Sequence, residues 1–162
     1  MLYIPKSLVA TIAIGLTLTC SSAHAADSYF TIRSADGSKT VAITAEAIEK
    51  AGSVTFKTTL PGTDGEELHE VRGPLMQSLL EQAGLEAEEY TAVALDNYEI
   101  DVPAEDFKTH GAIAAVEVDG KPLTVRDKGP AWIVYPRSDN PDLTDPIYES
   151  RSVWQLKELV AK

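Results

Sequence analysis

The chain has 162 residues, in which 25 acidic side chains face 14 basic ones, so its net charge at neutral pH is −11. A charge of this size disfavours nucleic acid and anionic membrane surfaces as partners, and it leaves a basic face on another protein as a compatible partner. The only cysteine is Cys20, so a chain that has lost its N-terminal segment contains no cysteine. Disulfides, thiolate nucleophiles, iron–sulfur clusters and cysteine-ligated zinc are then excluded.

The N-terminal segment is typical of a bacterial secretory signal peptide. Lys6 precedes an apolar run from Ser7 to Thr19, which is too short to span a bilayer as a helix. Ala23 and Ala25 then supply the small residues expected before a cleavage site. The pattern predicts export and cleavage after Ala25.

We therefore expect residues 1–25 to be a signal peptide and residues 26–162 to be one mature domain in the periplasm, with no membrane insertion after cleavage. Lipidation at Cys20 is the less favoured alternative. Thr19 takes the place of the small residue that normally precedes a lipidated cysteine.

The first half of the mature domain predicts short strands around one short helix. Thr44 can cap a helix that runs through Lys50, because Glu46 occupies its first turn and Gly52 follows its end. The β-branched and alternating segments nearby predict strands or extended chain at Tyr29–Arg33, Thr40–Ile43, Val54–Thr58 and Leu68–Arg72.

The clearest helix is expected after Arg72. Pro74 suits the first helical position, and Gly84 suits the position just beyond the last turn. The apolar side chains between them recur at helical spacing and define one core-facing side: Leu75, Met76, Leu79, Leu80 and Ala83. We interpret Met76 as part of the core rather than as a ligand.

The second half predicts further strands, joined by tight turns and another short helix at Pro103–Lys108. Asp96-Asn97 is a typical turn, and Asp119-Gly120 marks a hairpin. Strands are expected at Thr91–Leu95, Tyr98–Val102, Ile113–Val118, Leu123–Val125 and Ala131–Tyr135, then a long polar loop at Arg137–Ser150 and a final strand with Trp154. Many strands with a few short helices predict an α+β fold.

The stretch from Val125 to Leu156 concentrates flat rings and positive charges in an otherwise acidic chain. Its aromatic and basic side chains are Trp132, Tyr135, Tyr148, Trp154, Arg126, Lys128, Arg137 and Arg151. Because rings offer stacking surfaces and guanidinium groups bind carbonyl or phosphate oxygens, this stretch is the best candidate for a ligand site. The sequence shows neither a Ser–His–carboxylate order nor the spacing of a calcium loop, so no catalytic residue and no metal site is expected.

These residues also have structural interpretations. Trp132 lies inside an apolar strand and suits the core better than a stacking surface, whereas Trp154 suits either role. Asp96-Asn97 can be an ordinary turn. For the two arginines the alternative is a surface ion pair of little energetic consequence, between Arg126 and Asp127 and between Arg151 and Glu149.

Several segments, in their order and spacing, resemble the molybdopterin-binding domain of the sulfite oxidase superfamily. They are RGPLMQSLLEQAG from Arg72, DNYEIDVP from Asp96, VDGKPLTVRDKGPAWIVYP from Val118 and SRSVWQL from Ser150. Within them, Gly73-Pro74-Leu75 matches the start of a family helix, and Lys128-Gly129-Pro130 matches a later family turn. The resemblance spans nearly all of the mature domain and implies the irregular α+β fold of that family, with mixed sheets and a few short helices.

Two departures from the family pattern decide the expected chemistry. The cysteine whose sulfur binds molybdenum in the family is expected near Thr58-Thr59-Leu60, where this chain has none. The arginine that follows the later turn in the family falls near Trp132. Because a threonine hydroxyl cannot replace a thiolate for a soft metal, no molybdenum is expected.

The chain looks similar to small periplasmic members of the superfamily that lack this cysteine. Some of these bind pterins and act on a membrane-bound signalling partner. Such partners include enzymes that make or degrade cyclic di-GMP. The resemblance therefore implies a non-enzymatic, periplasmic pterin-binding or sensory protein. The first alternative is a molybdopterin-dependent oxidoreductase, or a subunit of one, with an unusual ligand set. The second is a ligand-free protein-interaction module.

A pterin needs ring faces on which to stack and polar partners along one edge. Carboxylates accept the paired donors of its amino-pyrimidinone edge, an amide both donates and accepts, and guanidinium groups bind its carbonyl or a phosphate. The predicted ligand-binding residues are Asp96, Asn97, Tyr98, Arg126, Asp127, Trp132, Tyr135, Arg151 and Trp154.

Overall fold

The computed structural model of the protein describes residues 28–62 and 67–162, so the predicted signal peptide lies outside the described residues. Within these ranges the chain forms three β-sheets and four short α-helices, which confirms the predicted α+β class. No helix in this part of the chain is both long and apolar enough to cross a membrane.

The largest sheet has five strands, in the order β2 (Thr40–Thr44), β1 (Ser28–Arg33), β11 (Leu156–Ala161), β5 (Glu89–Ala94) and β6 (Glu99–Pro103). β11, the last strand of the chain, runs parallel to β1, with Ile32 opposite Leu159, and antiparallel to β5. The C-terminal strand therefore joins the first hairpin of the domain to the β5–β6 hairpin. The predicted strands in this sheet are confirmed, with small shifts at their ends.

Two helices, α1 (Ala45–Ala51) and α2 (Met76–Ala83), pack against each other. α1 begins as predicted, because the Thr44 hydroxyl accepts a hydrogen bond from the Ala47 backbone N–H at 3.3 Å. Gly84 ends α2 in the left-handed conformation, with a φ of 58°, which suits glycine. The predicted core face of α2 is confirmed for its buried members, Met76, Leu79, Leu80 and Ala83.

The predicted start of α2 at Pro74 is wrong. Leu75 is extended and forms an isolated β-bridge with Ile113, and the Pro74 carbonyl accepts a hydrogen bond from the Ala114 N–H at 2.9 Å. These contacts with a neighbouring strand keep the backbone extended beyond the proline, so the helix begins only at Met76. Leu75 is half-buried against a smaller apolar cluster.

A second sheet has four strands, in the order β3 (Val54–Thr58), β4 (His69–Gly73), β8 (Glu117–Val118) and β9 (Lys121–Pro122), and β10 (Trp132–Val134) pairs separately with β7 (Ile113–Ala115). Gly73 allows β4 to approach β7 closely, because a Cβ there would lie 2.7 Å from the Ala114 carbonyl carbon. The hairpin predicted at Asp119-Gly120 is confirmed by the pairing of β8 with β9.

Two predicted strands in this region need correction. The strand predicted at Ile113–Val118 is split into β7 and β8. The strand predicted at Leu123–Val125 is not formed in the described chain, because the Thr124 carbonyl accepts hydrogen bonds from the N–H groups of Asp127 (2.9 Å) and Gly129 (2.7 Å). These bonds curl the backbone into a 3-10 turn instead.

The long loop predicted at Arg137–Ser150 is wrong in part, because it contains two helical segments. Pro141–Thr144 forms a 3-10 turn, and helix α4 runs over Pro146–Arg151. The Asp145 side chain caps α4 by accepting a hydrogen bond from the Ile147 N–H at 2.9 Å, and the proline that follows it occupies the first turn. One proline that looks like a breaker thus starts a helix.

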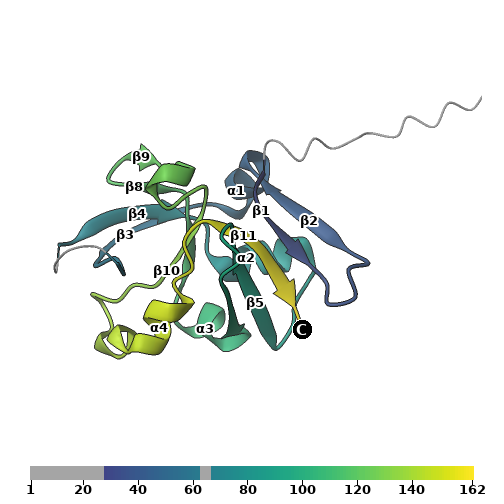
Figure 1. Cartoon of the computed structure of the whole chain (residues 1–162). Coiled ribbons are helices and arrows are strands. Elements are labelled where there is room, and N and C mark those ends of the chain that lie inside the picture. Colours follow the sequence, from purple (N-terminus) through teal and green to yellow (C-terminus); the bar gives the residue numbers. More distant parts are fainter. Residues whose placement is uncertain (1–27, 63–66) are drawn as a thin grey trace, which may run out of the picture.

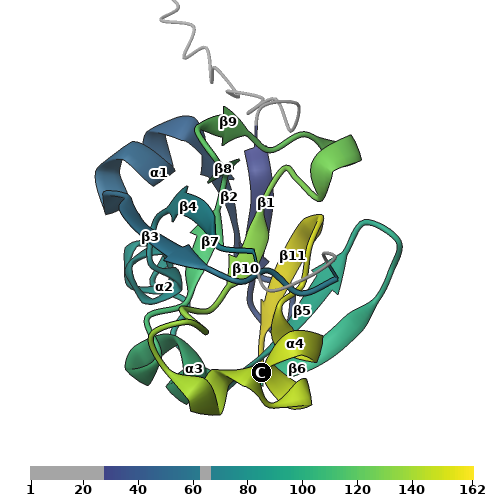
Figure 2. The same cartoon turned by 90° about the vertical axis from the view of Figure 1, so that its left-hand side faces the viewer.

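The predicted final strand also starts later than expected. β11 begins at Leu156, so Trp154 belongs to the segment that joins α4 to β11. Figures 1 and 2 both place α4 beside α3 (Ala104–Thr109) at one end of the molecule. Along β10 the side chains alternate between two apolar clusters, since Ile133 joins the larger one, while Trp132 and Val134 join the smaller one.

Candidate functional site

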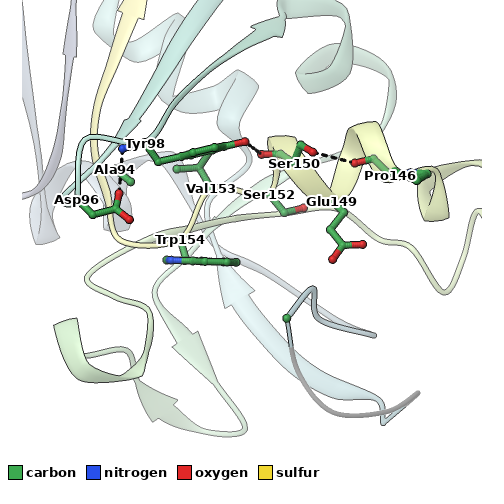
Figure 3. A pocket seen from close by; sticks show the side chains of 10 residues that line it. Ala94, Asp96, Tyr98, Pro146, Glu149, Ser150, Ser152, Val153 and Trp154 are labelled. Carbon is green, nitrogen blue, oxygen red and sulfur yellow. Dashed lines mark hydrogen bonds between the residues drawn. The ribbon is translucent and has the colours of Figure 1, made fainter.

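A pocket of about 390 Å³ opens where α4, the β5–β6 turn and the segment before β11 meet, as Figure 3 shows. Its lining residues are Gly62, Ala94, Asp96, Tyr98, Pro146, Glu149, Ser150, Ser152, Val153 and Trp154. They come from separate parts of the sequence that the fold brings together. A pocket of this volume is in the range that holds small organic ligands.

Two aromatic side chains face each other across this pocket. Figure 3 shows the rings of Tyr98 and Trp154 edge-on at opposite sides of the opening, with Asp96 toward one end and Glu149 toward the other. Both rings are accessible, since Tyr98 is 44% exposed and Trp154 is 39% exposed. The Tyr98 hydroxyl donates a hydrogen bond to the Ser150 carbonyl at 3.1 Å, so this ring is tied to α4.

The β5–β6 turn positions Tyr98 through Asp96. The Asp96 Oδ1 atom accepts a hydrogen bond from the Tyr98 N–H at 2.9 Å, and Asn97 adopts a left-handed φ of 67°. The interpretation of Asp96-Asn97 as a turn is therefore confirmed, yet Asp96 also lines the pocket. Its second oxygen makes no hydrogen bond within the described part of the chain, so this atom is available to a ligand.

Trp154 contacts a second indole on the side of the core. The rings of Trp132 and Trp154 meet edge to face, with their centroids 6.3 Å apart and an interplanar angle of 88°. Trp132 is only 2% exposed, and its Nε1–H donates to the Ser152 carbonyl at 3.0 Å. Trp132 is thus a core residue that supports the pocket from behind.

A buried polar network lies behind α4. The Asp106 carboxylate, from α3, accepts hydrogen bonds from the Tyr135 hydroxyl (3.1 Å) and from Nη1 of Arg151 (3.0 Å). The surface pair predicted between Arg151 and Glu149 is wrong, because the guanidinium reaches the buried carboxylate of α3 instead. Tyr135 is fully buried, so the network places Tyr135 and Arg151 behind the pocket wall rather than in its lining.

The same network constrains the far side of α4. Burial, and next the negative charge of Asp106, raises the pKa of the Tyr135 phenol above its ordinary value. Tyr148 packs edge-on against Tyr135, with centroids 5.4 Å apart, and its hydroxyl lies 3.1 Å from Nε2 of His110. These contacts attach α4 to α3 and to the end of β10, while other residues of α4 line the pocket.

Arg126 and Asp127 lie outside the pocket. The Asp127 carboxylate accepts a hydrogen bond from the Thr124 hydroxyl at 2.7 Å, which closes the 3-10 turn. No ion pair joins Arg126 to Asp127 in residues 28–62 and 67–162, so the predicted surface pair is wrong as well.

The pocket therefore contains part of the predicted site. It brings together Asp96, Tyr98 and Trp154, while Asn97 shapes the turn, Trp132, Tyr135 and Arg151 lie behind the walls, and Arg126 and Asp127 lie elsewhere. Glu149 and Ser150 were not predicted as site residues, because a loop was expected where they form a helix. Asp145-Pro146, a capping residue followed by a proline in the first turn, was the pattern that could have located that helix.

The position expected for the family cysteine does not fit a metal ligand. Thr58 is fully buried, and its hydroxyl donates to the Tyr135 carbonyl at 3.3 Å and accepts from the Arg137 N–H at 3.0 Å. This side chain ties the end of β3 to the segment after β10. It offers a soft metal neither a thiolate nor a free oxygen.

Comparisons with known proteins support the fold alone. No protein-family model matches the chain, and no curated protein matches it in sequence. Among solved structures it is similar to the sulfane dehydrogenase SoxCD from Paracoccus pantotrophus, a sulfite oxidase-family molybdoenzyme, with a TM-score of 0.58 and 16% identity. The match covers 82% of this chain and 37% of that chain. The protein thus has the sulfite-oxidase-type fold that the sequence resemblance implied.

Proposed function

We propose that the protein is a non-enzymatic, periplasmic pterin-binding protein, which holds a small pterin between Tyr98 and Trp154 and acts on a membrane-bound signalling partner. The observation that carries the ligand assignment is the pair of accessible rings that face each other across the pocket, with a carboxylate toward each end. The sulfite-oxidase-type fold adds support, because the resemblance stated above implies a pterin ligand.

The chemistry of the pocket suits a flat, polar heterocycle. Two ring faces provide stacking on both sides of the ligand, and aromatic stacking is favourable beyond the burial of area. A pterin also presents two parallel donors along its amino-pyrimidinone edge. Glu149 is the best acceptor for this pair, because its carboxylate lines the pocket and makes no hydrogen bond to another described side chain or backbone group. Asp96 provides one further oxygen at the other end.

Molybdenum-dependent oxidoreduction is the alternative that the site disfavours. The Thr58 hydroxyl, in the stretch where the resemblance places the family thiolate, is engaged with backbone groups. We therefore expect the purified protein to contain no stoichiometric molybdenum. Elemental analysis of dialysed protein tests this expectation, and stoichiometric metal that survives dialysis would contradict it.

The proposed partner rests on the resemblance and on charge. With a net charge of −11, the chain suits a partner with a basic face. The Tyr98 hydroxyl joins the β5–β6 turn to α4, so a ligand between the rings contacts two surface segments at once. Periplasmic cross-linking of the wild type and Trp154→Ala is expected to yield different membrane-protein adducts, whereas identical adducts would remove the link between ligand and partner.

The direct test of the ligand is a titration of purified, ligand-stripped protein with oxidised and reduced pterins, followed by tryptophan emission. Stacking on Trp154 is expected to quench this emission at micromolar pterin. The matched variants are Glu149→Gln, which removes the proposed acceptor, and Glu86→Gln, which changes an exposed carboxylate outside the pocket. Binding is expected to weaken by about tenfold only in Glu149→Gln, the scale of a charged hydrogen bond.

Absence of binding at micromolar concentration, together with no pterin that co-purifies with the protein, would contradict the proposal. A ligand-free interaction module would then be the better description of the protein. Equal weakening in both glutamate variants would show that the overall charge matters and that Glu149 has no specific role.

A further inference from the structure

Lys128 is a cation that the proposed pterin site does not use. It follows the 3-10 turn at Val125–Asp127 and has a left-handed φ of 69°. Its Nζ atom donates hydrogen bonds to the backbone carbonyls of Pro61 (3.2 Å) and Gly62 (3.1 Å). No carboxylate of the described residues forms an ion pair with it, and the neighbouring Asp127 is bonded to a hydroxyl instead.

The Lys128 ammonium also contacts both tryptophans. Nζ lies 4.7 Å from the ring centroid of Trp132 and 5.0 Å from that of Trp154. Because these two rings meet at 88°, the cation sits in the corner that they form. Cation–π attraction is strongest where water is partly excluded, and burial here lowers the pKa of Lys128 from its ordinary value of 10.5.

Two further contacts join Lys128 to the Trp154 wall of the pocket. The Lys128 carbonyl accepts a hydrogen bond from the N–H of Gln155, the residue next to Trp154, at 2.8 Å. Gly62 lies so near that a Cβ there would be 3.4 Å from Nζ of Lys128 and 3.5 Å from the Trp154 ring. Side chain and backbone of Lys128 therefore both act on the indole that lines the pocket.

We propose that Lys128 is a positioning residue of the pocket, whose ammonium orients the Trp154 ring by holding it against Trp132 and the Pro61–Gly62 backbone. An indole held in this way loses less conformational freedom when a flat ligand stacks on it, so the ligand binds more tightly. The orientation of Trp154 follows from its contacts with Lys128, Trp132 and Gly62. Its consequence for pterin affinity rests on the proposed function.

The test uses three variants of the full chain. Lys128→Met removes the charge but keeps a side chain of similar length and the same backbone requirement. Lys128→Arg retains a cation that can stack on indole rings. Lys157→Met is the matched control, because Lys157 is an exposed lysine on β11 that does not line the pocket.

The first readout is the pH profile of tryptophan emission without ligand. The wild type and Lys157→Met are expected to show a step below the ordinary lysine pKa of 10.5, as the ammonium beside the indoles loses its proton. The step is expected to disappear in Lys128→Met and in Lys128→Arg, since arginine does not titrate there. Tyrosine ionisation contributes equally to all four profiles, so the difference between profiles isolates Lys128.

The second readout is the dissociation constant for pterin at neutral pH. Lys128→Met is expected to weaken binding by about tenfold, and Lys128→Arg by less than about threefold, which is the range of one partly buried cation–π contact. Thermal unfolding monitored by circular dichroism shows whether each variant folds. If Lys128→Met does not fold, the pH profile and affinity of Lys128→Arg decide the proposal.

The two readouts separate this inference from the proposed function. A pH step that persists in the Lys128 variants would overturn the positioning of Trp154 by Lys128. An unchanged affinity in Lys128→Met, with wild-type binding intact, would overturn its role in the pocket. If the wild type binds no pterin, the proposed function fails, while the ligand-free profile still decides whether Lys128 holds the ring.

Discussion

Two regions built from similar residues behave in opposite ways in this protein. Behind α4, Asp106 is joined to Tyr135 and Arg151 by hydrogen bonds in a buried network. On the other side of the same helix, Tyr98 and Trp154 keep their rings open to solvent. Aromatic and charged side chains are thus not a sign of a binding site by themselves. What matters is whether their ring faces and polar atoms are already used by other parts of the protein.

The two regions are also mechanically connected. Arg151 ends α4 and holds it to α3 through Asp106, whereas Ser150, the preceding residue, accepts the hydrogen bond from Tyr98 on the pocket side. The buried network is therefore the support of one pocket wall. Damage to it should lower the stability of the fold, and damage to the open side should alter binding alone.

Asp106→Ala is the substitution with the largest expected effect. It leaves the Arg151 side chain, only 18% exposed, without its carboxylate partner, so the free energy of unfolding should fall by roughly 3–5 kcal/mol. Denaturation by urea measures this change. Asp101→Ala is the matched control, because its ion pair with Lys162 is at the surface, and its effect on the free energy of unfolding should be far smaller. Equal losses in the two variants would contradict the contrast between buried network and surface.

Leu79→Ala tests the apolar core on which both regions rest. Leu79 is fully buried on α2, so the substitution should reduce the free energy of unfolding by roughly 2–5 kcal/mol through lost burial and a residual cavity. The same urea experiment applies. A loss below about 0.5 kcal/mol, which is usual for surface positions, would show that the core face of α2 is misassigned.

Trp154→Ala tests the open side. Removal of the ring should weaken pterin binding by about 1–3 kcal/mol, the range measured for stacking of nucleic-acid bases on aromatic side chains. Isothermal titration calorimetry is suitable, since it does not depend on tryptophan emission. Tyr29→Ala, which removes a half-buried ring outside the pocket, should leave affinity unchanged. An unchanged affinity in Trp154→Ala would exclude the ring from the site.

Tyr135→Phe is the substitution with the smallest expected effect, and it tests one hydrogen bond of the buried network. At neutral pH it removes one hydrogen bond to Asp106 and should cost roughly 0.5–1.5 kcal/mol. At alkaline pH the native phenol keeps its proton, because its pKa is raised, whereas the unfolded phenol loses it near 10. Above pH 10 the unfolded state therefore binds fewer protons than the native state. The contribution of Tyr135 to stability is fully present below pH 10, and it falls as the pH rises above that value.

Urea denaturation across this alkaline range should accordingly show a weaker pH dependence in Tyr135→Phe than in the wild type. Some dependence should remain, since burial also raises the pKa of Tyr90. An identical slope in both proteins would mean that Tyr135 does not keep its proton in the native state.

The sequence by itself determined the features that depend on neighbouring residues. The Thr44 cap, the Gly84 helix end and the Asp119-Gly120 hairpin were all predictable, because each relies on contacts within a few positions of the chain. The order of longer segments was sufficient to indicate the sulfite-oxidase-type fold. The interpretation of Trp132 as a core residue, which was the alternative to its place among the ligand-binding residues, followed from the apolar residues on either side of it and is confirmed.

Only the tertiary structure decided which members of the aromatic and charged stretch form a pocket. Arg151 binds a carboxylate 45 positions away rather than its neighbour Glu149, and Tyr98 bonds a carbonyl 52 positions away on α4. Likewise, Leu75 stays extended because it forms a β-bridge with the distant Ile113. These choices depend on contacts between segments that are far apart in the sequence and that the fold brings together. Composition and local spacing carry no information on such long-range partners, because many carboxylates and carbonyls in an acidic chain would satisfy the same donor equally well.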